Sequence, residues 1–329
     1  MQDLSDADLN AWRSGPVSLR YVIGDFLLFT AGFEGRILES RFQDLVHAVA
    51  VPRPPIENLT SGLNTLLMRS FPTTACPHPI AVLQRAIRYT PFCYRRFLVD
   101  LNGTFENYLQ HFSSKSRSTL LRKIRRFKER SEGTIDWKVY TTVDDVANFL
   151  TCALEVSRNT YQERLLGLGL PSDSLFRERM YKLAAADRFR GFILFLQKRP
   201  IAFLSCPAVE DTLLYQHLGY NPEFQEYSPG TVLQFLAFQW LFSENLFSWF
   251  DFTEGEGPQK EFFSTHHVTC ADIYFFRRTL RNLFVVGTHY GWNFFGSLIG
   301  KTLRWLGWKA SFKKALRSLG LKSHGSSRI

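Results

Sequence analysis

The chain has 329 residues, of which 45% are hydrophobic, so it is long enough for two packed domains and too apolar to be disordered. Its net charge of +10 arises at one end, because the segment 273–329 contains 11 Lys and Arg and no Asp or Glu. The segment 1–272 has a net charge of −1, so the overall charge does not indicate a nucleic-acid-binding body, and we expect no DNA partner.

The first hundred residues contain strand patterns separated by loops. Strands are predicted within 17–39, with a hairpin turn at Gly24 and Asp25, and at 94–101. The proline-rich residues 51–80 predict mostly loop.

Helical signals run over residues 104–130, and from residue 134 strand and helix patterns follow one another regularly. The predicted elements are, in order, a strand (135–140), two helices (142–161 and 172–186), three strands (191–197, 201–208 and 212–220), a helix (231–246), a strand (248–252), a short helix and a strand (272–277). Thr142 and Ser172 are the predicted N-caps of the first two of these helices.

The cysteines and the N-terminus bear on the expected location. Five scattered cysteines form no CxxC pair, so the sequence predicts neither a zinc site nor a disulfide framework, and it indicates a reducing cytoplasm. The segment 1–15 lacks the basic and apolar regions of a signal peptide, and no uninterrupted apolar run is long enough to suggest a spanning helix. We therefore expect a cytoplasmic protein that uses no metal.

An anion site is predicted where the strand that ends at Tyr220 is followed by the loop Tyr227-Ser228-Pro229-Gly230 and a helix from Thr231. A helix N-terminus binds anions because its unpaired N–H groups and its dipole point the same way. Ser228, Gly230 and Thr231 are the candidate phosphate cradle. The alternative is a plain helix start, with Ser228 as N-cap and proline in the first turn.

A family resemblance covers roughly residues 90–280 and depends on several short motifs in a fixed order. These are FSSKSRS at 112–118 with Arg122 and Lys123, LGYNPEF at 218–224, YSPG at 227–230, FDF at 250–252, Gly255, Gly257, Lys260 and Phe263. In this order they resemble the GNAT acyltransferases, and more narrowly the FemAB-related, cellulose-biosynthesis-protein type. The resemblance implies an α/β (α+β) fold with a mixed central sheet, a degenerate N-terminal half-domain (1–100), an acyltransferase domain (101–280) and a basic helical C-terminal extension (281–329).

The resemblance implies an N-acyltransferase that uses acetyl-CoA or another acyl-CoA, with Tyr220, Tyr227 and Lys260 beside the phosphate cradle. The spacing of Gln225 and Gly230 departs from the usual phosphate-loop pattern. The proline between them also removes one N–H donor, so acyl carrier protein is an alternative donor. The amine acceptor that the resemblance implies is an amino sugar or an envelope-polysaccharide precursor.

Candidate catalytic residues lie on the two strands that flank this loop. Tyr215 and His217 are two residues apart, so we expect both on one face of their strand. His217 could take a proton from the attacking amine, or it could be a buried structural histidine. Asp251 could act as a base, orient the acceptor, or accept backbone N–H groups of the following glycine loop. Lys260 could stabilise phosphate or developing negative charge, or be an ordinary surface lysine.

Residues 113–130 contain eight Lys and Arg against one Glu, with an apolar face at helical spacing. The segment predicts an amphipathic helix whose basic face is either solvated or, through Lys115 and Arg117, in contact with an anionic acceptor. FemAB-like aminoacyl transfer from charged tRNA is a further alternative that would need an accessible basic groove here. The characteristic RNA-binding signatures are absent from the sequence.

The basic segment 281–329 has apolar residues at helical spacing, among them Trp292, Phe295, Ile299 and Leu303. A basic amphipathic helix of this kind suits an anionic membrane surface, which would make the protein peripheral on the inner face of the cell membrane. The alternative is a helix that packs back on the body. The competing class of function is a membrane-associated, non-catalytic scaffold for polysaccharide assembly.

Overall fold

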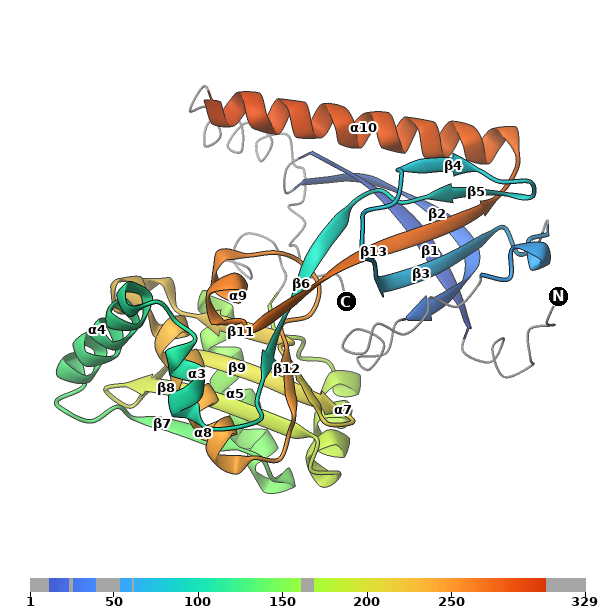
Figure 1. Ribbon diagram of the computed structural model, residues 1–329. Helices are drawn as coiled ribbons and strands as arrows, with labels where there is room; N and C mark the ends of the chain where they lie inside the picture. The colour runs from blue at the N-terminus through green and yellow to red at the C-terminus, as the bar shows by residue number, and fades with distance from the viewer. Residues whose placement is uncertain (1–11, 24–25, 40–53, 61, 161–168, 306–329) are drawn as a thin grey trace. The chain divides into compact units, whose positions relative to one another are not determined.

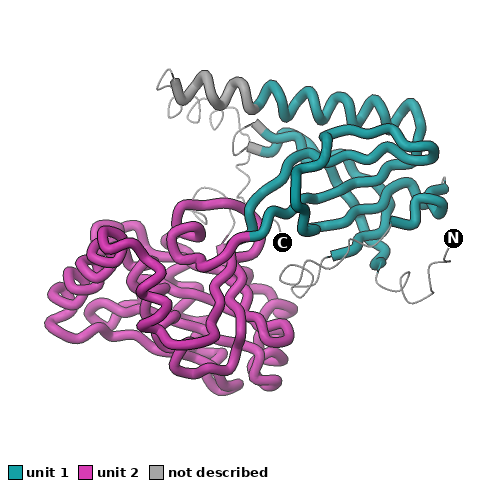
Figure 2. The backbone as a smooth tube through the Cα atoms, in the orientation of Figure 1, with its two compact units in different colours: residues 1–96, 268–329 teal, residues 97–267 magenta. Residues whose placement is uncertain are grey.

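The computed structural model describes residues 12–23, 26–39, 54–60, 62–160 and 169–305, with the side chains of residues 23, 26 and 297–305 left out (Figure 1). Two compact units make up the chain (Figure 2). Unit 1 combines residues 1–96 with residues 268–329, and unit 2 is the continuous segment 97–267. The sequence predicts three consecutive regions that are divided at residues 100 and 280. In the structure, by contrast, unit 1 combines residues from both ends of the chain.

Unit 1 is built on a mixed sheet with the strand order β1-β2-β3-β13-β5-β4. Its elements are β1 (Arg13–Ile23), β2 (Phe26–Glu39), the short helix η1 (Ile56–Asn58), β3 (Thr65–Pro72), β4 (Ile80–Val82), β5 (Ala86–Tyr89) and β13 (His266–Arg277). β1 and β2 pair antiparallel, as the hairpin prediction requires, although its turn residues lie outside the described residues. The proline-rich segment contains more strand than the sequence predicts, since β3 lies in the core of the unit.

The long helix α10 (Leu280–Trp305) packs one face on this sheet. Val286 joins the buried cluster around Tyr89 and Phe276, and the Trp292 indole N–H donates to the Val22 carbonyl at 2.7 Å. Trp292 is half-buried and Phe295 is exposed, while the side chains of Ile299 and Leu303 lie outside the described residues. The alternative of a helix that packs on the body therefore holds for the face that carries Val286 and Trp292.

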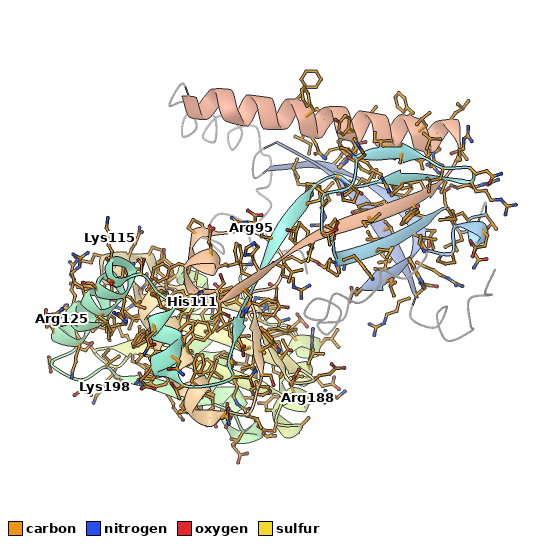
Figure 3. All side chains as sticks on the ribbon, viewed as in Figure 1. Arg95, His111, Lys115, Arg125, Arg188 and Lys198 are labelled. Atoms are coloured by element: carbon orange, nitrogen blue, oxygen red, sulfur yellow. A yellow bond between two sulfur atoms is a disulfide. The ribbon has the colours of Figure 1, made fainter. Side chains whose placement is uncertain are left out.

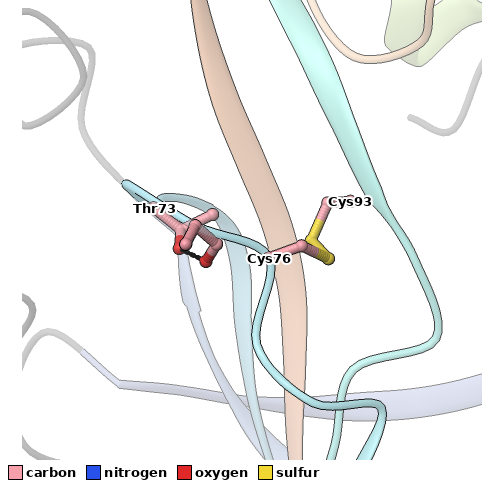
Figure 4. Close-up of a disulfide and its surroundings, with 4 residues drawn as sticks. Thr73, Cys76 and Cys93 are labelled. Atoms are coloured by element: carbon pink, nitrogen blue, oxygen red, sulfur yellow. Dashed lines mark hydrogen bonds between the residues drawn. A yellow bond between two sulfur atoms is a disulfide. The ribbon is translucent and has the colours of Figure 1, made fainter.

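A disulfide joins Cys76 to Cys93 in unit 1, which corrects the expectation of a chain without disulfides (Figure 4). Next to it the Thr73 hydroxyl donates to the Ala75 carbonyl. The spacing of the two cysteines carries no motif, because Cys76 lies in the loop after β3 and Cys93 is the first residue of β6 (Cys93–Asp100). The disulfide also removes the cysteine argument for a reducing compartment.

Unit 2 contains a mixed sheet with the strand order β6-β12-β10-β9-β8-β7, and β11 extends the β10 direction along β9. The strands are β6 (Cys93–Asp100), β7 (Trp137–Tyr140), β8 (Phe189–Leu196), β9 (Arg199–Val209), β10 (Thr212–Leu214), β11 (His217–Tyr220) and β12 (Trp249–Asp251). β10 and β12 are parallel, and the other pairs in this unit are antiparallel. The predicted mixed α/β sheet and the predicted order of elements are confirmed.

Helices cover both faces of the unit 2 sheet. The elements are α3 (Phe105–Gln110), α4 (Ser114–Arg130), α5 (Val143–Asn159), α7 (Ser174–Ala185), the 3-10 helix η2 (Pro222–Tyr227), α8 (Pro229–Glu244) and α9 (Pro258–Phe263). Side chains of α3, α4, α8 and α9 share one buried cluster with Leu204 of β9, and side chains of α5 and α7 share another with Phe203. Because neighbouring strand residues point to opposite faces, these clusters lie on the two sides of the sheet.

Local sequence explains most of the helix ends in unit 2. Thr142 caps α5 as predicted, in a capping box with Asp145. The cap of α7 is Asp173 rather than the predicted Ser172, because the Asp173 carboxylate accepts the Phe176 N–H at 2.8 Å. α8 is apolar around most of its circumference and is accordingly buried along its length.

Candidate functional site

A β-bulge separates β10 from β11. The Gln216 N–H donates to the Ser205 carbonyl at 3.2 Å, and His217 pairs with the same Ser205, so two residues lie opposite one. The extra residue shifts the side-chain alternation by one position. Tyr215 therefore packs in the cluster on the α8 side, while His217 contacts Phe176 on the α7 side. The prediction that Tyr215 and His217 share a face is wrong for this reason.

Beyond the bulge the two central strands separate. The parallel pairing of β10 with β12 covers three residues and ends at Leu214 and Asp251, and among the described strands β11 pairs with β9 alone. The Asn221 N–H donates to the Ile201 carbonyl at 2.8 Å. This bond shows which residues of β11 direct their backbone groups towards β9, because every second residue does so in an antiparallel pair. The N–H and C=O groups of Leu218 and Tyr220 consequently point away from β9. An open strand edge of this kind can pair with an extended ligand that carries amides.

The N-terminus of α8 adjoins this open edge. A Cβ atom built on Gly230 would lie 3.4 Å from the Leu218 side chain and 3.5 Å from that of Tyr220. Ser228 adopts a left-handed conformation (φ 52°) without a side-chain cap, and its carbonyl accepts the Thr231 N–H at 2.9 Å. Pro229 has no N–H. In the described part of the chain the Gly230 N–H has no acceptor, so this helix start offers one backbone donor where a phosphate loop usually offers several.

A pocket of about 240 Å³ opens between α4, the start of α8 and α9. Its lining includes Lys123 of α4, Thr231 of α8 and Gln259 of α9, with Phe262 and Phe263 as apolar walls. Half-buried Lys123 is the charged residue in this lining. The pocket therefore combines one cation, a hydroxyl and an amide with an apolar floor.

A buried glutamine supports the pocket from below. Gln234 of α8 is fully buried, and its side-chain carbonyl accepts the Gln259 amide N–H at 2.7 Å. The Gln234 amide nitrogen has no hydrogen-bond partner among the described residues. Gln234 thus holds Gln259, which lines the pocket, in place.

The predicted basic contacts lie elsewhere on α4. Lys115 is exposed and Arg117 is half-buried, and neither lines the pocket. Figure 3 shows Lys115 and Arg125 on the outer side of the helix. Tyr227 lies under the guanidinium groups of Arg126 and Arg130, at 5.6 and 5.9 Å from its ring centre. The Tyr227 ring is thus held by α4 and fixes the loop before α8.

His217 and Tyr215 have strongly perturbed acidities. Burial, with a smaller contribution from the charge of Arg179, lowers the pKa of His217 from 6.5 to about 4. Its Nε2 atom is buried without a hydrogen-bond partner in the described structure. Burial raises the pKa of Tyr215, whose ring lies 5.4 Å from that of Phe252. At neutral pH His217 is uncharged and Tyr215 keeps its proton.

Asp251 and Lys260 hold the loop that follows β12. The buried Asp251 carboxylate accepts the Thr253 N–H at 2.7 Å, where Thr253 has a positive φ of 60°. The Lys260 ammonium donates to the carbonyls of Phe252 and Glu254, both at 2.7 Å. These contacts fix the conformation of the loop that follows β12. Among the described residues no group of three His, Cys, Asp or Glu is placed to bind a metal.

Residues 114–261 match the family model of the acetyltransferase (GNAT) domain. This segment of the chain is therefore similar to the GNAT acetyltransferase domain. The predicted resemblance to GNAT acyltransferases is confirmed by this match, which lies within unit 2. No curated protein matches the chain.

Several solved structures are similar to the chain at low identity. The structure of FemX has 10% identity over 82% of this chain and 89% of its own, with a TM-score of 0.48. The C-terminal domain of a putative lysylphosphatidylglycerol synthetase from Agrobacterium fabrum has 12% identity over 83% and 88%, with a TM-score of 0.49. L-PGS from Bacillus licheniformis has 14% identity over 86% and 90%, with a TM-score of 0.44.

The structure brings together only part of the predicted site. Tyr220 of β11 lies beside Gly230, and Thr231 lines the pocket. Lys115 and Arg117 lie on α4 outside the lining of the pocket, and Tyr227 contacts Arg126 and Arg130 of the same helix. Gln234 and Gln259 were not predicted. The available signal was weak: Gln234 is the one polar residue in the apolar run VLQFLAF.

Proposed function

We propose that the protein is an N-acyltransferase that takes an acyl group from an acyl-CoA thioester and transfers it to an amine. The observation that carries this proposal is the open edge of β11 beside the first turn of α8 in a GNAT domain. The Leu218 and Tyr220 backbone groups would pair with the amides of the pantetheine arm, as an added strand does.

The phosphate groups of the donor fit the adjoining pocket. Thr231 and Lys123 line this pocket and would supply a hydroxyl donor and positive charge, and the N–H of Gly230, the residue before Thr231, is a further donor. A charge-assisted contact from Lys123 would replace the N–H donors that Pro229 and the turned-in Thr231 N–H do not provide. Phosphate binding at this site would therefore depend on the Lys123 side chain of α4 more than on backbone N–H groups at the start of α8.

The proposed reaction is a direct attack of the neutral amine on the thioester carbonyl. The C–N bond forms, the C–S bond breaks, the thiolate leaves, and the amine proton passes to water. We assign Tyr215 as the donor of a proton to the thiolate, because it lies where β10 and β12 separate and stays protonated at neutral pH, and its phenolate then takes a proton back from water. His217, with its low pKa and its place on the other face, is a weak base and serves as a positioning residue. Holding the two substrates in place supplies much of the rate.

The test is isothermal titration of the full chain with acetyl-CoA, longer acyl-CoAs and the corresponding S-acyl pantetheines. We expect acyl-CoA to bind more tightly than the pantetheine thioester, and Lys123→Met to weaken acyl-CoA binding about tenfold. Lys128→Met, a change of an exposed lysine on the same helix, is the matched control and should bind normally. A folded protein that binds none of these thioesters would refute the proposal.

The acceptor that we propose is an amine on a sugar-linked envelope precursor, and acyl carrier protein is the alternative carrier of the acyl group. Aminoacyl transfer from tRNA is a second candidate, favoured by the exposed Arg122, Arg125 and Lys128 of α4. A non-catalytic scaffold is the third, favoured by the single free donor at the start of α8. Transfer assays with aminoacyl-tRNA and with acylated carrier protein distinguish these cases when acyl-CoA fails to bind.

A further inference from the structure

One face of α10 is apolar, and the described residues of unit 1 leave it exposed. Leu280 is 87% exposed, Phe284 71% and Phe294 60%. The outer face of α10 consists of Leu280, Leu283, Phe284, Tyr290, Phe294 and Phe295. At 100° per residue these positions fall on one side of the helix, and Gly287 and Gly291 lie between them with open space in place of a side chain. The result is a continuous apolar surface along more than four helical turns.

The opposite face explains why this helix holds its orientation. Asn282 donates to the Asn64 side chain at 2.9 Å and to the Arg277 carbonyl at 2.8 Å. The two ring nitrogens of His289 form hydrogen bonds with the Tyr89 hydroxyl at 2.6 Å and with the Arg20 carbonyl at 3.1 Å. These buried polar contacts fix which side of α10 meets the sheet. The exposed aromatic residues are therefore a fixed surface rather than side chains on a loosely placed tail.

We propose that the outer face of α10 binds an anionic membrane surface, with the helix lying parallel to it. An exposed apolar surface of this extent marks an interaction site. The charge of the surrounding sequence identifies the partner, because the segment 273–329 contains 11 Lys and Arg and no acidic residue. An anionic lipid surface attracts such a segment while the apolar face enters the boundary between headgroups and acyl chains.

A second copy of the chain fits this surface less well. Pairing two outer faces would bring two acid-free basic segments together, and their like charges repel. A spanning role is also unsupported: no helix in the described part of the chain is long and apolar enough to cross a membrane. Binding in the plane of the surface agrees with both observations. The proposal does not depend on the acyltransferase activity.

The test is flotation of the full chain with phosphatidylcholine vesicles and with vesicles that also contain phosphatidylglycerol. We expect binding to the anionic vesicles that weakens as salt is added. The double variant Phe284→Gln, Phe294→Gln should lose about tenfold or more of this binding, because two exposed aromatic anchors are removed. The matched control is Leu175→Gln, since Leu175 is a 75% exposed residue of α7 in unit 2, and it should float like the wild type.

The double variant changes only exposed side chains, so its circular dichroism and its titration with acyl-CoA should match the wild type. Equal flotation of the wild type and the double variant would overturn the proposal, as would binding that ignores the lipid charge. A dimer in size-exclusion chromatography that the double variant abolishes, without any flotation, would show that a second copy covers this face.

Discussion

The buried imidazole of His217 predicts a specific loss of stability at low pH. Its ring lies 5.9 Å from that of Phe176, and burial lowers its pKa from 6.5 to about 4. Between these two pH values the unfolded chain takes up a proton at His217 that the folded chain does not. The unfolded state therefore binds more protons, and the free energy of unfolding falls as the pH falls from 6.5 towards 4.

The size of this effect follows from the two pKa values. At pH 5 the histidine of the unfolded chain is almost fully protonated, while about a tenth of the buried one is, and the difference amounts to about 2 kcal/mol relative to pH 8. The effect approaches about 3 kcal/mol near pH 4. A group with an unshifted pKa would contribute nothing over the same range.

The measurement is urea unfolding followed by tryptophan fluorescence at pH 8 and pH 5, for the wild type, His217→Gln and the exposed control His111→Gln. His217→Gln removes the titration, so its free energy of unfolding should fall about 2 kcal/mol less between the two pH values than that of the wild type. His111→Gln should behave like the wild type. If His217→Gln retains the pH dependence of the wild type, the reasoning about the buried imidazole is refuted.

Three further predictions concern stability. Gly219→Ala should destabilise unit 2 by about 1–3 kcal/mol in urea unfolding, because the new Cβ would lie 2.4 Å from the Phe203 ring; an unchanged midpoint would contradict this. Cys76→Ser removes the bond to Cys93, 17 residues away, and should cost unit 1 about 3 kcal/mol; a reducing agent should reproduce the loss in the wild type and leave the variant unaffected. Arg190→Met should lower the free energy of unfolding by about 3–5 kcal/mol, because Arg190 is 1% exposed and its guanidinium pairs with two carboxylates. If the variant unfolds at the same temperature as the wild type, Arg190 does not stabilise the fold in this way.

Only part of the candidate site could be predicted from the sequence. The strand ending at Tyr220, the loop to Gly230 and the helix after it were predicted in the correct order, since each depends on a local pattern. The face of His217 was predicted wrongly, because a bulge of one residue reverses the alternation and has no clear signature in the segment around Gln216. Lys123 was included in a family motif, but only the packing of α4 against α9 places it in a pocket.

The sequence by itself determined the α/β order of elements, the GNAT resemblance, the basic amphipathic character of α4 and the acid-free C-terminal segment. The resemblance depends on short motifs in a fixed order, and the other properties depend on composition and on the helical and strand periodicities, which are local. Tertiary structure decided the pairing of Cys76 with Cys93, the contact of Gln259 with Gln234 and the uncovered face of α10. Each of these depends on distances between residues far apart along the chain, and on which side of an element the rest of the fold leaves exposed.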